Sequence, residues 1–246
     1  MAHGQPSACT RRARKVTSGD EERLAFASET GDRLGEGRAL GNLANLHADM
    51  GETQKAIDLY NKRLKIAREL DDRRGEASVL GNLGDAYADI GEAARAVRFH
   101  EKPLKLFREL RERRCEGITL VNLARAHSLL RNTATAIDLV EQSLQICREV
   151  GDKRCEGAAF AVPGDALFDR GELHAAAECY HLWENISRQL GDRRAEANAL
   201  WRASLVECQD PVAIAFSSVP TPSLTAGLLR RFLTVVAPRR SSGSCC

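Results

Sequence analysis

The chain has 246 residues, of which 43% are hydrophobic, 5% aromatic and 28% charged. Its 36 basic side chains are nearly balanced by 34 acidic ones, which argues against a dedicated nucleic-acid binder with its large basic excess. No run of the sequence approaches the roughly 18 apolar residues that a membrane helix needs, so we expect no stable membrane insertion.

The N-terminal stretch, residues 1–18, is polar and basic, and it lacks the apolar core of a secretory signal. We expect it to be disordered and the protein to be cytoplasmic. The chain contains eight cysteines without any Cys-x-x-Cys pair. In a reducing compartment we expect them to be free thiols.

From residue 19 onward the sequence repeats every 40 residues, which is the mark of a repeat array. Glutamates stand at Glu36, Glu76, Glu116, Glu156 and Glu196, and alanines stand at Ala56, Ala96, Ala136 and Ala176. The array is predicted to comprise a partial repeat (19–31), four repeats (32–71, 72–111, 112–151, 152–191) and a terminal helix (192–208). A disordered Ser-, Pro- and Arg-rich tail (209–246) follows.

Each repeat is predicted to be a pair of helices. In the first repeat, apolar residues at three- and four-residue steps predict one helix over 33–50 and a second over 53–70. Asp32 is the expected N-cap, and Gly51 suits the left-handed stop between the two helices. Such pairs cannot bury their apolar stripes alone, so they stack into an all-α array.

The array departs from this pattern in three places. Pro103 falls inside a second helix, and Pro163 replaces a packing leucine in the first helix of the fourth repeat, which we expect to be the least regular. Residues 24–32 match 64–72, so the chain enters the array in the middle of a second helix. This favours a truncated array or a fragment of a longer gene product.

In the tail, residues 224–236 form either a short amphipathic segment or an unstructured stretch.

The repeat resembles the tetratricopeptide repeat (TPR) in its forty-residue form. The family's large–leucine–small–aromatic series falls on Leu40, Leu43, Ala44 and His47, and its second-helix alanine falls on Ala56. This resemblance implies a right-handed α-solenoid of stacked helix-turn-helix repeats with a concave groove. The Leu-Gly-Asn signature and the Gly-Asp-Arg-x-x-Glu start further resemble the Pins/LGN group of cell-polarity adaptors and the arrays of signalling ATPases.

An asparagine recurs at one position in three repeats, as Asn42, Asn82 and Asn122. The resemblance implies that this position faces the groove, where an amide can donate to and accept from a peptide backbone. The alternative is that these asparagines cap turns or bridge neighbouring helices. The predicted groove residues are Arg38, Asn42, Asn45, Asp49, Ser78, Asn82, Asp85, Asp89, Asn122 and Arg125.

The expected function is that of an adaptor or scaffold that binds a protein or peptide ligand, with a role in signalling and without catalysis, cofactor or metal. No phosphate-binding loop or nucleophile elbow is present. His174, Cys179 and His181 lack the spacing of a zinc site. Three alternatives stay open: a detached sensor segment of a signalling ATPase or transcription regulator, an enzyme hidden in the array, and a degenerate product without a partner.

Overall fold

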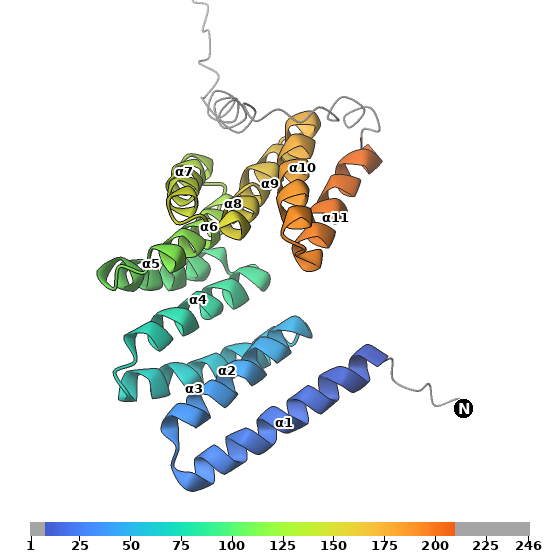
Figure 1. The fold of residues 1–246 in the computed structure, drawn as a ribbon. Coiled ribbons are helices and arrows are strands. Elements are labelled where there is room, and N and C mark those ends of the chain that lie inside the picture. The colour runs from blue at the N-terminus through green and yellow to red at the C-terminus, as the bar shows by residue number, and fades with distance from the viewer. Residues whose placement is uncertain (1–7, 210–246) are drawn as a thin grey trace, which may run out of the picture. The chain divides into compact units, whose positions relative to one another are not determined.

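The computed structural model describes the backbone of residues 8–209 and the side chains of residues 19–209. Every regular element in this part of the chain is a helix (Figure 1). The helices are α1 (Ala8–Thr30), α2 (Arg33–Asp49), α3 (Thr53–Glu69), α4 (Arg73–Asp89), α5 (Ala93–Glu109), α6 (Arg113–Leu129), α7 (Thr133–Glu149), α8 (Lys153–Ala159), α9 (Ala161–Asp169), α10 (Leu173–Gln189) and α11 (Arg193–Gln209). The predicted all-α fold of stacked helix pairs is confirmed.

The helices form two compact units, which we describe separately. The first unit ends at Glu112 and contains α1 to α5, and the second begins at Arg113 and contains α6 to α11. Within the first unit α2 packs on α3, and α4 packs on α5, as the two helices of one repeat. Within the second unit α6 packs on α7, while α10 contacts both α9 and α11. None of the described helices is long and apolar enough to cross a bilayer.

The core of each repeat consists of the apolar stripes that the helical period predicts. In the first unit Leu40 and Leu43 of α2 are buried, together with Ala56, Tyr60 and Leu64 of α3. Fully burying one such large side chain contributes about 1.5–3 kcal/mol. Packing between helices therefore holds the array together, since helices of this length are marginal alone.

The backbone is left-handed at one residue every 20 places, just after the ends of α1 to α7, α9 and α10. Six of these positions are glycines, namely Gly31, Gly51, Gly91, Gly151, Gly171 and Gly191, with φ between 65° and 79°. The other three are Asp71, Arg111 and Arg131, with φ of 51°, 57° and 61°. The following N–H closes the turn, as Glu52 N donates to His47 O at 2.9 Å. Apart from the join between α8 and α9, consecutive helices of the described residues therefore share one type of connection.

Aspartates cap the first helices of the repeats. The carboxylate of Asp32 accepts a hydrogen bond from the Gly35 N–H at 2.9 Å, and that of Asp72 accepts from the Gly75 N–H at 2.8 Å. Asp152 and Asp192 do the same in the second unit, at 3.0 and 3.1 Å. The predicted N-cap at Asp32 is confirmed.

The paired arginines at the helix starts are neutralised by carboxylates of the same unit. Arg73 donates to Glu109 at 2.5 Å, and Arg74 lies 3.5 Å from Glu112. In the second unit Arg114 donates to Asp152 at 2.6 Å. These arginines therefore form ion pairs within each unit.

Helix α1 begins at Ala8, within residues 1–18 that were expected to be disordered. Alanine, arginine and lysine in this stretch are favourable helix formers, which accounts for the backward continuation of the helix. The predicted tail, 209–246, starts at Gln209, which the structure places at the end of α11. Residues 210–246, with the segment 224–236 and the final cysteines, lie outside the described residues.

The fourth repeat is the least regular, as expected. Its first helix is interrupted at Phe160, between α8 and α9. Pro163 lies in the first turn of α9, where its missing N–H leaves no bond to the Ala159 carbonyl. Pro103, by contrast, lies inside a helix, α5, that runs without a break.

Cys147 and Cys155 form a disulfide that joins the end of α7 to the first turn of α8. Their Cα atoms are 5.8 Å apart, within the usual range for such a bond. The expectation of free thiols is therefore wrong for this pair, because the left-handed turn at Gly151 brings the two helix ends together. Cys115, Cys179 and Cys208 are free.

Candidate functional site

Eight polar side chains line one face of α2 and α4 in the first unit, and we call this set the polar strip. Steps of three and four residues place four of them on one face of each helix. The strip consists of Arg38, Asn42, Asn45 and Asp49 on α2 and Ser78, Asn82, Asp85 and Asp89 on α4. All eight are exposed or half-buried, so the strip is open to solvent.

Asn45 joins the two helices at the centre of the strip. Its Oδ1 accepts a hydrogen bond from the Asn82 amide at 3.2 Å and another from the Tyr60 hydroxyl at 2.7 Å. Asn82 therefore bridges neighbouring helices, as the structural alternative proposed. An amide carries two N–H donors and an acceptor oxygen, and this bridge occupies one of the donors.

The second unit contains the same arrangement three repeats later. Asp165 stands in place of Asn45, and its Oδ1 accepts from the Tyr180 hydroxyl at 2.9 Å and from Arg202 Nε at 2.8 Å. A residue at the recurring asparagine position thus links successive first helices in both units. This bridge gives a structural reason for a polar residue at that position.

The charges around Tyr60 fix its protonation state. Burial raises the pKa of Tyr60 to about 12, and the carboxylates of Asp85 and Asp49 act in the same direction, whereas Arg63 lowers it. The Tyr60 hydroxyl is therefore a hydrogen-bond donor at neutral pH and no general base. The imidazole of the buried His100 lies 3.6 Å from Asp85, which ties this end of the strip to α5.

A cavity of about 690 Å³ adjoins the strip between α1 and α2. Arg38 and Asn42 line it from α2, while Arg23 and Phe26 line it from α1. The predicted site residues Arg38 and Asn42 thus lie beside an apolar ring and a basic side chain. The structure brings these two together with the other six residues of the strip on two adjacent helices.

The last two predicted site residues, Asn122 and Arg125, belong to α6 of the second unit. Both are half-buried, and both interact with other groups of the chain. Asn42 and Asn82 lie in the first unit and Asn122 lies in the second, so the continuous ladder of these asparagines stays a prediction.

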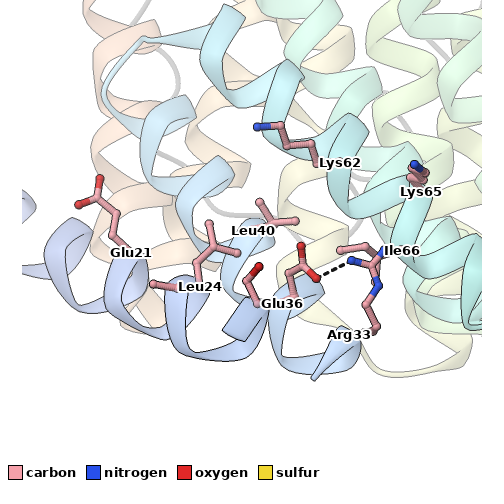
Figure 2. A pocket seen from close by; sticks show the side chains of 10 residues that line it. Glu21, Leu24, Arg33, Glu36, Leu40, Lys62, Lys65 and Ile66 are labelled. Carbon is pink, nitrogen blue, oxygen red and sulfur yellow. Dashed lines mark hydrogen bonds and ion pairs between the residues drawn. The ribbon is translucent and has the colours of Figure 1, made fainter. Parts of the chain in front are cut away.

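A second cavity, of about 530 Å³, lies between α1, α2 and α3 (Figure 2). Leu24, Leu40 and Ile66 provide its apolar surface, and charged side chains such as Lys62 surround them. Figure 2 shows Arg33 bonded to Glu36 at its edge. This cavity is an amphipathic depression.

The described residues contain no cluster of three or more His, Cys, Asp or Glu side chains that could hold a metal ion. Burial raises the pKa of the Cys179 thiol to about 12, so it stays protonated at neutral pH. His181 lies 3.0 Å from Glu184 in an intrahelical contact. His174, Cys179 and His181 therefore act as separate residues.

Sequence reasoning missed two residues that contact the strip. Tyr60 donates a hydrogen bond to Asn45, and His100, at the same position of the next repeat, lies beside Asp85. The signal for both was present. Tyr60 and Tyr180 each stand 15 residues after a polar acceptor, at Asn45 and Asp165. A search for polar pairs at this spacing would have found the hydrogen bonds from Tyr60 to Asn45 and from Tyr180 to Asp165.

A family model described as "Tetratricopeptide repeat" matches residues 35–109 and 75–149. A search of curated proteins found no relative that matches the sequence. The predicted tetratricopeptide repeats are confirmed, whereas the resemblance to the Pins/LGN adaptors is not confirmed by these comparisons.

Solved structures of low sequence identity share the fold. BtubC (BKLC) from P. vanneervenii is 17% identical, with a TM-score of 0.63 and coverage of 98% of this chain and 99% of that one. A Rap protein in complex with competence and sporulation factor is 14% identical, with a TM-score of 0.59 over 82% of this chain and 60% of that one.

A signal transduction ATPase with a tetratricopeptide repeat sensor, from Pyrococcus horikoshii, is 16% identical, with a TM-score of 0.65. The match covers 92% of this chain and 37% of that one, so this chain is similar to only part of the ATPase. At such identities the likeness shows the fold alone. Residues 35–149, just under half of the chain, consist of tetratricopeptide repeats.

Proposed function

We propose that the chain is a non-catalytic adaptor that holds an extended peptide or a helix of a partner protein on the polar strip. The observation that carries this proposal is the contrast between the two faces of α2 and α4. Most of their apolar residues are buried in the unit, while eight polar groups on the two helices stay open to solvent. Such groups can contact a backbone and its side chains along several residues.

The charges of the strip favour one direction of the ligand. Arg38 lies toward the start of α2, whereas Asp49, Asp85 and Asp89 lie toward the ends of α2 and α4. A ligand with an acidic group near the helix starts and a basic group near the helix ends is complementary to this pattern. Asn42 supplies sequence-independent contacts between these ends.

The neighbours of known structure support a role of this kind in signalling. One of them, the Rap protein, is seen with competence and sporulation factor, and another is the quorum sensor NprR from B. thuringiensis. For this chain we propose a protein or peptide ligand in a cytoplasmic setting. Asn122 and Arg125 would extend the contact to a longer ligand.

Selection of short random peptides on the immobilised full chain tests this proposal. The affinity of the selected peptides is measured by fluorescence anisotropy. We expect Asn42→Ala and Asp89→Ala each to weaken binding about 5- to 30-fold, the range of a moderate interface contact. Lys62→Ala and Lys65→Ala on α3 are matched controls, exposed like the strip residues, and should leave the affinity unchanged. Equal affinity of the strip variants and the controls would place the ligand elsewhere.

A second candidate is a sensor segment of a larger signalling ATPase. The similarity to part of the Pyrococcus horikoshii ATPase favours it. An antibody against the repeats would then detect a protein well above 27.0 kDa in the cells of origin. A single band at the mass of this chain would speak against it.

A further inference from the structure

One face of α1 lies open where the equivalent face of α3 is covered. Helix α1 has the register of a second helix, forty residues before α3. On α3, Ile66 is 4% exposed because it packs on α2, where a Cβ added to Gly37 would lie 3.2 Å from an Ile66 methyl. Phe26, at the same position of α1, is 68% exposed. No described helix covers this face.

Helix α11 shows the complementary defect. It has the register of a first helix, like α2, α4 and α6. In earlier repeats the residues equivalent to Leu200 are Leu40, Leu80 and Leu120. They are at most 3% exposed, because second helices cover them. In α11 Leu200 is 45% exposed and its neighbour Trp201 is 61% exposed. No described second helix lies over them.

We propose that α11 of one copy of the chain docks on the open face of α1 of a second copy, so that the two helices form a complete repeat between copies. The 40-residue repeat then runs on from one copy into the next, with the second copy offset by five repeats. In this register Ala197 lies on Phe26 of the second copy, as Gly37 lies on Ile66 within the chain. Trp201 lies on Arg23 of the second copy, as Gly41 lies beside Arg63.

Charge complementarity supports the same register. In three repeats an arginine at the start of the first helix bonds a glutamate 36 residues later, in the pairs Arg33–Glu69, Arg73–Glu109 and Arg113–Glu149. Arg193 of α11 and Glu29 of α1 hold the same two repeat positions. The docked helices bring Arg193 of one copy to Glu29 of the next. Because such exposed pairs contribute little free energy, this one sets the register, while the apolar contacts supply the affinity.

The junction between copies differs from the internal repeats in two respects. Trp201 replaces a glycine whose added Cβ would lie 2.4 Å from the Arg63 guanidinium, so Arg23 must move aside and stack on the indole. Leu205 replaces Asn45, so no bridge to Asn42 of the second copy forms. The cavity of about 690 Å³ between α1 and α2, which Arg23 and Phe26 line, provides room for the larger side chains.

The contact is heterologous, because two different surfaces meet. A pair of copies still has one α1 and one α11 with an open face, so further copies can add at either end. Association of this kind continues into open chains unless a rotation closes it. It is independent of the peptide proposal, although Arg38 and Asn42 border both surfaces. Asp89 lies outside the junction, so Asp89→Ala should weaken peptide binding without weakening self-association.

Analytical ultracentrifugation of the full chain over a wide concentration range tests the junction. The wild type should increase in mass with concentration beyond a dimer. Phe26→Asp and Trp201→Asp should each lower self-association at least about tenfold, since a charge replaces a buried aromatic side chain. Both residues are largely exposed, so the helical circular dichroism should not change. Met50→Asp, at a residue that is 43% exposed at the end of α2, is the matched control, and Asp89→Ala should also associate like the wild type.

Mixing the two variants gives the sharpest result. An equimolar mixture of Phe26→Asp and Trp201→Asp should form a one-to-one heterodimer, because one variant contributes an intact α11 and the other an intact α1. A mixture that stays monomeric overturns the proposal. So does a wild type that stays monomeric at all concentrations. A closed dimer that neither variant weakens also overturns it.

Discussion

Asp71 carries a left-handed backbone, with φ of 51°, at a position where six other turns of the array use glycine. Such a conformation costs an ordinary residue about 1–2 kcal/mol. Glycine avoids this cost, but it loses more conformational entropy on folding than aspartate does, which offsets part of the gain. Asp71→Gly should therefore raise the free energy of unfolding by about 0.5–1 kcal/mol in urea titrations.

The reverse change supplies the control. Gly91→Asp places the same side chain at a φ of 79° and should lower the free energy of unfolding by about 1 kcal/mol. If Asp71→Gly destabilises the protein instead, the aspartate side chain contributes something to the turn that its geometry does not show.

Tyr60 gives the stability of the first unit a dependence on alkaline pH. Its pKa is about 12 in the folded chain and about 10 in an unfolded one, with burial as the first cause. The folded state keeps a proton that the unfolded state has lost, so this contribution is fully present below pH 10 and disappears as the pH rises through 12. The loss approaches about 1.4 kcal/mol per pH unit within this window.

Tyr60→Phe removes this titration. The decrease in unfolding free energy between pH 9 and pH 11 should be about 1 kcal/mol smaller in the variant than in the wild type. Tyr180 and Cys179, whose pKa values are also raised by burial, remain in both proteins and cancel from the comparison. Identical pH dependence of the two proteins would contradict the assignment.

At the scale of helices, Pro163 accounts for the interruption between α8 and α9. The equivalent residues of the other repeats are Leu43, Leu83 and Leu123, and all three lie within unbroken helices. Pro163→Leu restores the N–H that can bond the Ala159 carbonyl. The variant should unfold with a free energy about 1–3 kcal/mol higher and show more helical circular dichroism.

A matched change in the first unit tests the same reasoning. Leu83→Pro should break α4 and lower the free energy of unfolding by about 3 kcal/mol or more, because it removes a buried leucine as well as a hydrogen bond. If Pro163→Leu leaves the interruption in place, Gly157 and Gly164 in the flanking turns become the cause to examine.

The sequence was sufficient to predict the helices because their period, caps and turn residues agree in each repeat. The Asp32 cap, the turn at Gly51 and the irregular fourth repeat all follow from local rules. The bridge from Asn82 to Asn45 could not be distinguished from a free groove residue, since the choice depends on the distance between two helices. The Cys147–Cys155 disulfide was missed for the same reason.

For the whole molecule, the repeat period predicts stacking, but it leaves open which surfaces remain free. The structure shows three kinds of open surface within its described residues, namely the polar strip, the face of α1 that carries Phe26, and the face of α11 that carries Trp201. Of these three, we propose that the polar strip is the surface through which the chain binds a partner.

Quantitative mass spectrometry of the proteins retained from cell extract tests this claim most directly. The baits are the wild-type chain, an Arg38→Ala/Asn42→Ala/Asp89→Ala variant and a control with Asp58→Ala/Lys62→Ala/Lys65→Ala on α3, all with equal helical circular dichroism. We predict a set of proteins that the wild type and the control retain and that the strip variant loses at least about tenfold. Retention of the same proteins by all three baits would contradict the claim.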